Sequence, residues 1–196
     1  MLSITAKKLL KYAPRLIPIL FFIGFSFVFS YSSPENILGF IGVENAYLLI
    51  FFLALLGGLT TFSGIPFHLV LIALATGGLN PFLLGTVTAI GVMLGDSTSY
   101  YIGHQGRSLM SPRLQSMLER LSFVQQKYPK LLPIFFFLYG SLLPLSNDVI
   151  TIPMGLLRYP FWRVMIPLGL GNLVFNISLA LVAAYAYEYL QALPFF

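Results

Sequence analysis

The chain has 196 residues, of which 58% are hydrophobic and 9% are charged, and its mean hydropathy is +0.88. These proportions exclude an ordinary soluble domain. Although the net charge is +5, the basic residues flank apolar segments, so we expect anionic lipid as their partner and no nucleic acid. The absence of cysteine excludes disulfides, thiolate metal sites and a cysteine nucleophile.

The basic residues are confined to three stretches of the chain. All 11 Lys and Arg residues lie within residues 7–15, 107–130 and 158–163. Short loops that keep Lys and Arg stay on the cytoplasmic side, so we expect these stretches on one face of the membrane. This predicts a multi-pass integral membrane protein with a cytoplasmic N-terminus and a C-terminus on the opposite side. In a prokaryote, the membrane would be the plasma membrane.

The first half of the chain mixes full spans with shorter apolar pieces. Because a span needs about 20 residues, we expect a first transmembrane helix over 14–31, followed by a polar connection. Residues 46–77 hold two pieces that are each too short to span, which predicts a re-entrant helical hairpin. A long transmembrane helix over 80–103 follows, and then an amphipathic interfacial helix over 107–130. The hairpin break contains Ser63, Gly64 and Pro66.

The second half repeats this pattern. Residues 131–157 form a second predicted hairpin, broken at Pro144 and Ser146, and residues 160–187 form a second long helix. Eleven positions separate Pro66 from Gly77, and the same number separates Pro144 from Gly155. One hairpin starts outside and the other inside, so the two copies are inverted, an arrangement typical of transporters. The predicted fold is therefore an all-α polytopic membrane protein with two inverted repeats and an N-terminal transmembrane helix.

Ionisable and amide side chains within apolar segments mark a candidate pathway. Asp148 is either a proton-linked gate or an N-cap of a helix that begins at Val149. Asp96 is expected towards the inner side, where it either forms a structural ion pair with Arg158 or Arg163 or acts in the pathway. The pathway set is His68, Asp96, Asn147, Asp148, Asn172 and Asn176.

Several of these residues have a structural alternative. His68 either titrates near neutral pH or bonds a hairpin carbonyl. Asn172 and Asn176 lie one turn apart and are expected to satisfy the broken backbone of the second hairpin, or to contact substrate. Arg158 and Arg163 either hold a lipid phosphate or mark only the cytoplasmic boundary.

The chain resembles the DedA family, whose superfamily includes the VTT-domain or SNARE-associated Golgi proteins. Gly95-Asp96, Tyr100, Gly103 and Gly106 are similar to one family motif, and the resemblance covers about residues 45–187. It implies hairpins whose tips meet near the bilayer centre and a role in moving lipids between leaflets. The chain departs from the family pattern because His68 replaces an acidic residue, while Ser141 and Asn147 replace arginines.

These observations favour a flippase or scramblase for phospholipid or polyprenyl-phosphate headgroups, with proton coupling as an option. The alternatives are an ion- or proton-coupled transporter of small solutes, an intramembrane hydrolase, and a structural assembly protein. We expect no cofactor, no metal and no catalytic residues, since no nucleophile loop, phosphate loop or metal cluster stands out. A homodimer stays open.

Overall fold

The computed structural model describes residues 34–59, 67–106 and 127–191, together with residues 24, 118 and 122. Every regular element within these ranges is a helix. The predicted first transmembrane helix, the break at Ser63, Gly64 and Pro66, and most of the predicted interfacial helix lie outside the described residues.

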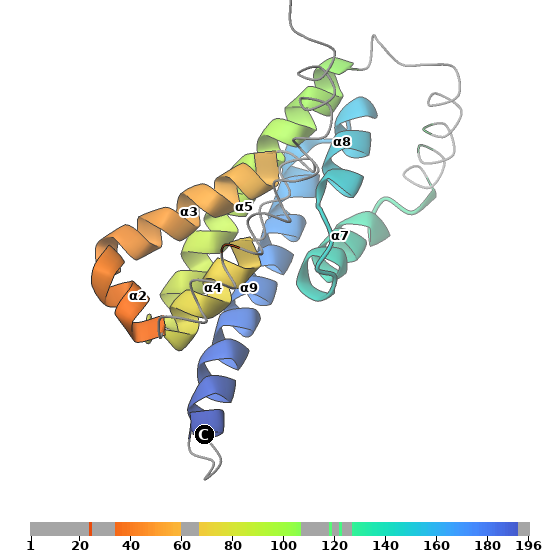
Figure 1. Ribbon diagram of the computed structural model, residues 1–196. Coiled ribbons are helices and arrows are strands. Elements are labelled where there is room, and N and C mark those ends of the chain that lie inside the picture. Colours follow the sequence, from red (N-terminus) through yellow and green to blue (C-terminus); the bar gives the residue numbers. More distant parts are fainter. Residues whose placement is uncertain are drawn as a thin grey trace, which may run out of the picture.

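Along the described chain, each of the two long helices follows a pair of shorter helices (Figure 1). In order they are α2 (Pro34–Ile41), α3 (Val43–Leu59), α4 (Phe67–Thr76), α5 (Pro81–Gly106), α7 (Leu131–Leu142), α8 (Asp148–Leu156) and α9 (Phe161–Gln191).

Most predicted elements are present, with shifted bounds. Helices α3 and α4 occupy the first predicted hairpin, and α7 and α8 occupy the second. The long helices α5 and α9 run past their predicted ends, to Gly106 and Gln191. The polar connection predicted over residues 31–45 is wrong, since α2 forms within it. There Pro34 opens the helix, and Gly42, at a φ of +83°, separates α2 from α3.

The start of α5 shows how local sequence sets a helix end. The side-chain Oδ1 of Asn80 accepts the backbone N–H groups of Phe82 and Leu83 at 3.0 and 3.1 Å. Asn80 is thus an N-cap, and Pro81 follows at the first helical position, where it has no donor to lose. These two residues fix the point at which the first long helix begins.

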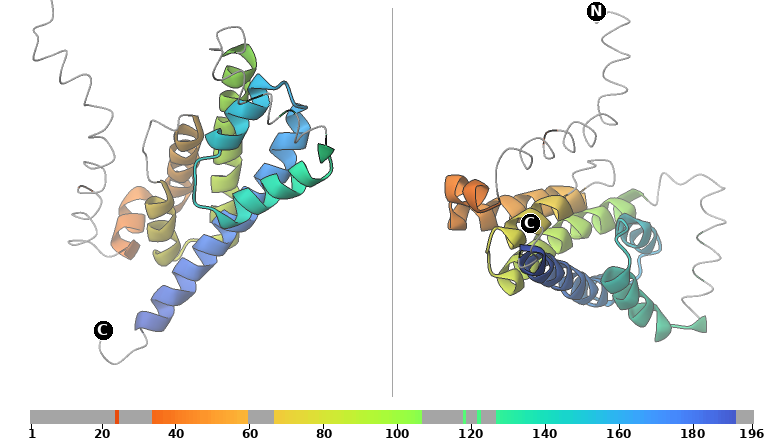
Figure 2. Two further views of the ribbon diagram at one scale, coloured as in Figure 1. Left: turned by 90° about the vertical axis from the view of Figure 1, so that its right-hand side faces the viewer. Right: turned by 60° about the horizontal axis from the view of Figure 1, so that its bottom comes forward.

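The two long helices form the centre of the molecule. In Figure 1, helix α5 rises from the end of α4 to Gly106, whereas α9 descends from the end of α8 to Gln191, so the pair is antiparallel (Figures 1 and 2). Helix α3 packs along α5 and α7 packs along α9. The second short helix of each half packs on the long helix of the other half, because α8 packs on α5 and α4 packs on α9. Each half therefore contributes one short helix to the long helix of the other half.

The turns that precede the long helices have the same backbone structure. In one turn, the N–H of Gly78 bonds the carbonyl of Ala75 and the N–H of Leu79 bonds that of Leu74. In the other, Arg158 bonds Gly155 and Tyr159 bonds Met154, so every matched pair is separated by 158 − 78 = 80 positions. Gly78 and Arg158 have positive φ values of 94° and 55°. Both turns are Schellman motifs, in which a left-handed residue ends the helix.

Glycines allow the helices to approach closely, and again the two halves match. A Cβ added at Gly91 of α5 would lie 2.6 Å from the backbone oxygen of Phe51 in α3. A Cβ at Gly171 of α9 would likewise collide with the backbone oxygen of Phe137 in α7. These two glycines are also 80 positions apart. The helix packing thus extends the correspondence beyond the turns.

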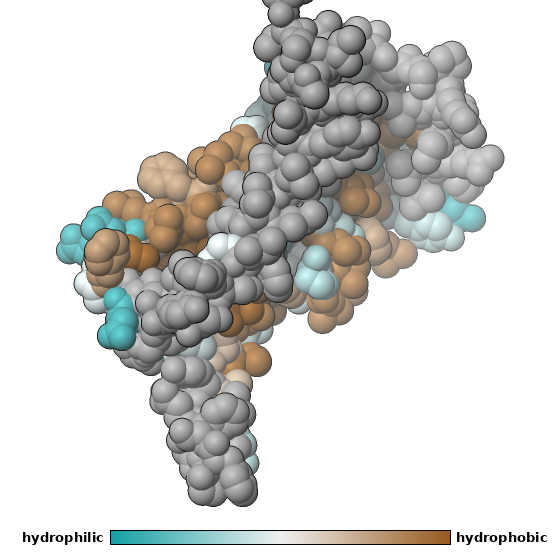
Figure 3. All heavy atoms as spheres, viewed as in Figure 1, coloured by the Kyte–Doolittle hydropathy of each residue, from teal (hydrophilic) through white to brown (hydrophobic). Residues whose placement is uncertain are grey.

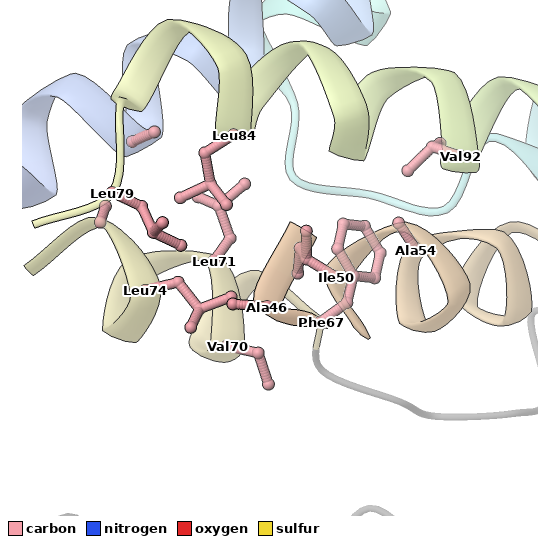
Figure 4. Packing of buried hydrophobic residues seen from close by; sticks show 12 residues of the cluster. Ala46, Ile50, Ala54, Phe67, Val70, Leu71, Leu74, Leu79, Leu84 and Val92 are labelled. Carbon is pink, nitrogen blue, oxygen red and sulfur yellow. The ribbon is translucent and has the colours of Figure 1, made fainter. Parts of the chain in front are cut away.

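The buried apolar residues form two clusters, each centred on one half, although Ala180 of α9 belongs to the first and Tyr100 of α5 to the second. The first joins α3, α4 and α5, with the ring of Phe67 beside Ile50 and Ala54 (Figure 4). The second joins α7, α8 and α9 around Phe136, Tyr159 and Leu168.

Large apolar side chains also cover the outside of the molecule. Figure 3 shows them along α3 and on the side that carries α7. On α7, Phe135, Leu138 and Leu142 are 55%, 46% and 68% exposed. Two helical segments, Pro81–Gly106 and Phe161–Ala186, are long and apolar enough to cross a membrane. An apolar exterior of this extent suits a hydrocarbon environment.

Candidate functional site

A buried polar cluster joins three helices near the point where the chain breaks between α7 and α8. The side-chain Nδ2 of Asn147 donates to Oδ2 of Asp96 at 2.7 Å and to Oδ1 of Asn172 at 3.2 Å. Asn172 Nδ2 also donates to Oδ2 of Asp96, at 3.4 Å. All three side chains are buried. We call Asp96, Asn147 and Asn172 the amide–carboxylate cluster.

Each member of this cluster comes from a different element. Asp96 lies on α5 and Asn172 on α9, so the two antiparallel long helices supply the walls. Asn147 is the N-cap residue of α8, but its side chain makes no capping bond. The amide that could have capped α8 is instead directed at Asp96. The helix break therefore supplies a polar side chain to the space between the long helices.

Hydrogen bonds from neighbouring residues shape the break itself. The hydroxyl of Tyr139 on α7 donates to the backbone oxygen of Ser146 at 2.8 Å. The backbone N–H of Asp148 donates to Oγ of Ser146 at 3.3 Å. Pro144, Leu145 and Ser146 remain exposed, whereas Asn147 and Asp148 turn inward. The predicted break at Pro144 and Ser146 is thus a non-helical segment held at its end by Tyr139.

The expected pairing of Asp96 with an arginine is wrong. Its hydrogen-bond donors are the amides of Asn147 and Asn172, while Arg158 and Arg163 are exposed near the turn before α9. Amide donors stabilise a buried carboxylate without supplying a compensating positive charge. Asp148 lies near enough to act electrostatically on Asp96. The cluster is therefore acidic as well as buried.

The predicted N-cap role of Asp148 is also wrong. Helix α8 begins at Asp148 and its N-cap residue is Asn147, one position earlier than predicted. Asp148 is 6% exposed and occupies the first turn, where a negative charge interacts favourably with the helix dipole. Packing of α8 on α5 brings Asp148 close enough to Asp96 to act on it electrostatically.

His68 and Asn176 lie outside the amide–carboxylate cluster. The His68 ring, at the start of α4, is 4.0 Å from the Phe67 ring and 5.6 Å from that of Phe175 on α9, centroid to centroid. Asn176 is 2% exposed, and its Nδ2 donates to the backbone oxygen of Asn172 at 2.8 Å. That bond lies within α9. Asn176 therefore does not serve the broken backbone of the second hairpin in the way that we expected.

Tyrosines contribute contacts that the sequence did not suggest. Besides Tyr139, the hydroxyl of Tyr100 on α5 donates to the backbone oxygen of Tyr159 at 2.5 Å. This bond ties α5 to the turn that precedes α9. The apolar neighbours of Tyr139 and Tyr159 concealed them, although a buried tyrosine hydroxyl usually needs a partner. Tyr100 belongs to the motif that carries the family resemblance, so its presence there was a usable signal.

Metal ligands are scarce in the part of the chain that the structure describes. No group of three or more His, Cys, Asp or Glu side chains gathers there. The cluster offers one carboxylate and amide groups, which suit protons, hard cations or polar headgroups better than a transition metal.

A comparison with protein families identifies the chain. The model of the VTT domain matches residues 65–185, which includes α4 to α9 and every member of the cluster. The chain belongs to the VTT-domain family. Comparisons with curated proteins and with solved structures gave no match.

Membership confirms the resemblance that the Gly95-Asp96 motif indicated. VTT-domain proteins are membrane-associated and are often linked to transport. The two candidate membrane-spanning helices, α5 and α9, both lie in the VTT domain. The amide–carboxylate cluster therefore lies between the two candidate membrane-spanning helices of a membrane protein.

Proposed function

We propose that this VTT-domain protein is a lipid transporter, a flippase or scramblase that moves phospholipid or polyprenyl-phosphate headgroups between leaflets. The observation that carries the proposal is the amide–carboxylate cluster, buried between two long apolar helices where a third helix is interrupted. Polar groups at such a place are costly, and in membrane proteins they commonly line a pathway.

The proposed architecture is a pair of inverted repeats with re-entrant hairpins. It is supported by the antiparallel long helices and by the matched turns at Gly78 and Arg158. In this arrangement α3 and α7 enter from opposite faces, and α4 and α8 begin near the middle and return to those faces. The N-terminus is cytoplasmic and the C-terminus is on the other side, as the three basic stretches suggest.

A headgroup crosses by exchanging hydrogen bonds with the cluster while its acyl chains remain in lipid. Asn147 and Asn172 each offer donors and an acceptor, so they can bond a phosphate or a hydroxyl in turn. The exposed apolar face of α7 keeps the tails beside the helix break. Arg158 and Arg163, exposed near the α8–α9 turn, are suited to capture the phosphate at the cytoplasmic surface.

Asp96 gives the pathway a proton-linked element. A protonated Asp96 could donate a hydrogen bond, whereas the ionised form only accepts. The change would rearrange the bonds from Asn147 and Asn172, which now converge on a single carboxylate oxygen. Proton binding and release at Asp96 would thus open and close the path between α8 and the long helices. The neighbouring Asp148 adds to the electrostatic effect of each change.

A proton- or ion-coupled transporter of small solutes is the second candidate. It is favoured by the charge of the cluster, since a carboxylate with amide oxygens suits a cation better than a phosphate. The arginines of the described chain lie away from it, near the α8–α9 turn. We propose no hydrolytic activity, because Oδ2 of Asp96 already receives two amide donors and is poorly placed to share a proton with a second carboxylate.

Reconstitution into liposomes tests the proposal. Vesicles carry fluorescent phospholipid or labelled polyprenyl phosphate, and a membrane-impermeant quencher reports the fraction in the outer leaflet, with and without a pH gradient. We expect nearly complete quenching in proteoliposomes and about half in protein-free vesicles. Equal quenching in the two preparations for every lipid would refute lipid transport, and uptake of a small solute with a proton would then favour the second candidate.

A further inference from the structure

A second polar pair, His68 and Asn176, occupies the positions that correspond to the two aspartates, Asp148 and Asp96. Positions related by the 80-residue correspondence include Gly78 and Arg158 in the turns, and Gly91 and Gly171 in the helix packing. The same step relates Asp96 to Asn176 and His68 to Asp148. Asn176 therefore occupies the position relative to the start of α4 that Asp96 occupies relative to the start of α8.

Independent contacts agree with this relation. Helix α8 packs on α5, which carries Asp96, and α4 packs on α9, which carries Asn176. The His68 ring lies against that of Phe175, the residue before Asn176. The start of α4 and this turn of α9 are therefore neighbours, as the start of α8 and the Asp96 turn of α5 are.

The amide of Asn176 has an unused acceptor. Its Nδ2 donates to the backbone oxygen of Asn172, which fixes the amide orientation, and its Oδ1 is buried. Among the described residues, no hydrogen-bond donor reaches this Oδ1. A buried acceptor without a donor is destabilising. At a pathway position, such an acceptor is suited to a ligand that brings its own N–H or O–H group.

We propose that Asn176 and His68 form a second headgroup site, which binds the hydrogen-bond donor of a lipid headgroup, an ammonium N–H or a hydroxyl. Oδ1 of Asn176 accepts the donor. The aromatic rings of Phe67 and Phe175 lie beside His68 and favour a cationic group over an anionic one. The inference rests on the proposed lipid transport. It assigns different roles to the two sites: the acidic cluster around Asp96 couples protons, and the Asn176 site selects the headgroup.

Lipid binding by native mass spectrometry of the detergent-purified protein tests this site directly. The probes are phosphatidylethanolamine, phosphatidylglycerol and phosphatidylcholine with identical acyl chains, of which only phosphatidylcholine has no donor in its headgroup. We expect one or both donor-bearing lipids to bind about tenfold more tightly than phosphatidylcholine. Preference for phosphatidylethanolamine identifies an ammonium ligand, and preference for phosphatidylglycerol identifies a hydroxyl. Equal binding of all three lipids would overturn the proposal.

Variants separate a ligand-binding Asn176 from a structural one. Asn176→Leu should abolish the preference without lowering Tm, because it removes an unsatisfied acceptor. Ser178→Ala, at an exposed position on the same helix, should leave the preference intact. If the leucine variant fails to fold, Asn176→Asp decides, since it keeps the size and the acceptor: a retained preference supports the site and a lost preference contradicts it. An unchanged preference in a folded leucine variant also contradicts it.

The outcome is separable from that of the proposed function. Headgroup preference without transport in liposomes would refute the lipid transporter and leave the binding site standing. Transport by a protein that binds all three lipids equally would refute the binding site and support the lipid transporter.

Discussion

At the scale of residues, the proposed site depends on one carboxylate that accepts hydrogen bonds from two amides. Asp96 is 2% exposed, and its Oδ2 accepts bonds from Asn147 and Asn172. Sequence marked all three as candidates, because polar residues in apolar segments stand out. It could not pair them, since the pairing depends on how α8 sits along α5. The sequence suggested an arginine as the partner of Asp96, but its hydrogen-bond donors are the amides of Asn147 and Asn172.

Asn147 should therefore be critical for stability. Asn147→Leu leaves Oδ1 of Asn172 without its bond from Asn147 and removes the shorter of two donors to Asp96. We expect a loss of about 2–4 kcal/mol in the free energy of unfolding, the cost of breaking a buried polar network. Unfolding in detergent, followed by circular dichroism, measures it.

The matched control is Asn45→Leu. Asn45 is exposed, and its Nδ2 donates to the backbone oxygen of Ile41 at 3.0 Å, so a change of no more than about 0.5 kcal/mol is expected. Equal losses of unfolding free energy in the two variants would show that the buried cluster contributes no more stability than the exposed hydrogen bond of Asn45.

At the scale of elements, breaks and turns decide where each helix can go. The end of the first predicted hairpin at residue 77 agrees with the end of α4 at Thr76, because Gly77-Gly78 follows it. Helix α2 was missed, because a short segment with Glu, Asn and Gly looks like a loop. The backbone at Arg158 was also missed, since nothing in a Leu-Arg-Tyr-Pro sequence announces a positive φ. The equivalence of the two turns became visible only through their hydrogen bonds.

The Arg158 turn gives a prediction about backbone strain. Arg158 holds a φ of 55° at the position that Gly78 fills in the other half. Arg158→Gly should raise the free energy of unfolding by about 1 kcal/mol, because glycine adopts this conformation without steric cost. Gly78→Ala should lower it by a similar amount. Thermal unfolding in detergent compares them, and a destabilised Arg158→Gly variant would mean that the side chain, rather than the backbone, dominates this turn.

The contact between α3 and α5 gives a second prediction at this scale. In Gly95→Ala the new methyl would lie 2.5 Å from the backbone oxygen of Leu55 and 2.7 Å from Cα of Gly58. Because backbone atoms cannot move aside cheaply, we expect a loss of about 1–3 kcal/mol.

Gly39→Ala serves as the control for that substitution. Gly39 lies in α2 with no atom within 4 Å of the added methyl, so helix propensity should leave this variant unchanged or more stable by up to about 1 kcal/mol. Similar changes in the free energy of unfolding for Gly95→Ala and Gly39→Ala would rule out close packing of α3 on α5.

At the scale of the whole molecule, two antiparallel long helices each receive a short helix from the opposite half. Composition predicted the membrane, and the repeat of broken and unbroken segments predicted two shorter helices before each long helix. The crossing of α4 and α8 could not be predicted, because it depends on tertiary packing between distant segments. This crossing brings Asp96 to Asn147, so both halves contribute residues to the amide–carboxylate cluster.

Orientation in the membrane is open to a direct test, helped by the absence of cysteine from the chain. A cysteine at Asn36 should react with a membrane-impermeant maleimide on intact cells, whereas a cysteine at Lys130 should react only after permeabilisation. The reason is that Lys130 belongs to a basic stretch and Asn36 lies in the segment without basic residues. Both sites are exposed. Labelling of both from the outside would contradict the proposed inverted topology.

The central claim is that lipid headgroups cross through the cluster around Asp96. Its most direct test is the rate of labelled phospholipid movement in proteoliposomes that contain either the wild-type protein or Asp96→Asn, with Thr98→Ala on an exposed face of α5 as the control. We predict fast movement in the wild type and in Thr98→Ala, and a rate at least about tenfold lower in Asp96→Asn, equivalent to about 1.4 kcal/mol in the barrier. A wild-type rate equal to that of protein-free vesicles, or an unchanged rate in Asp96→Asn, would contradict the account.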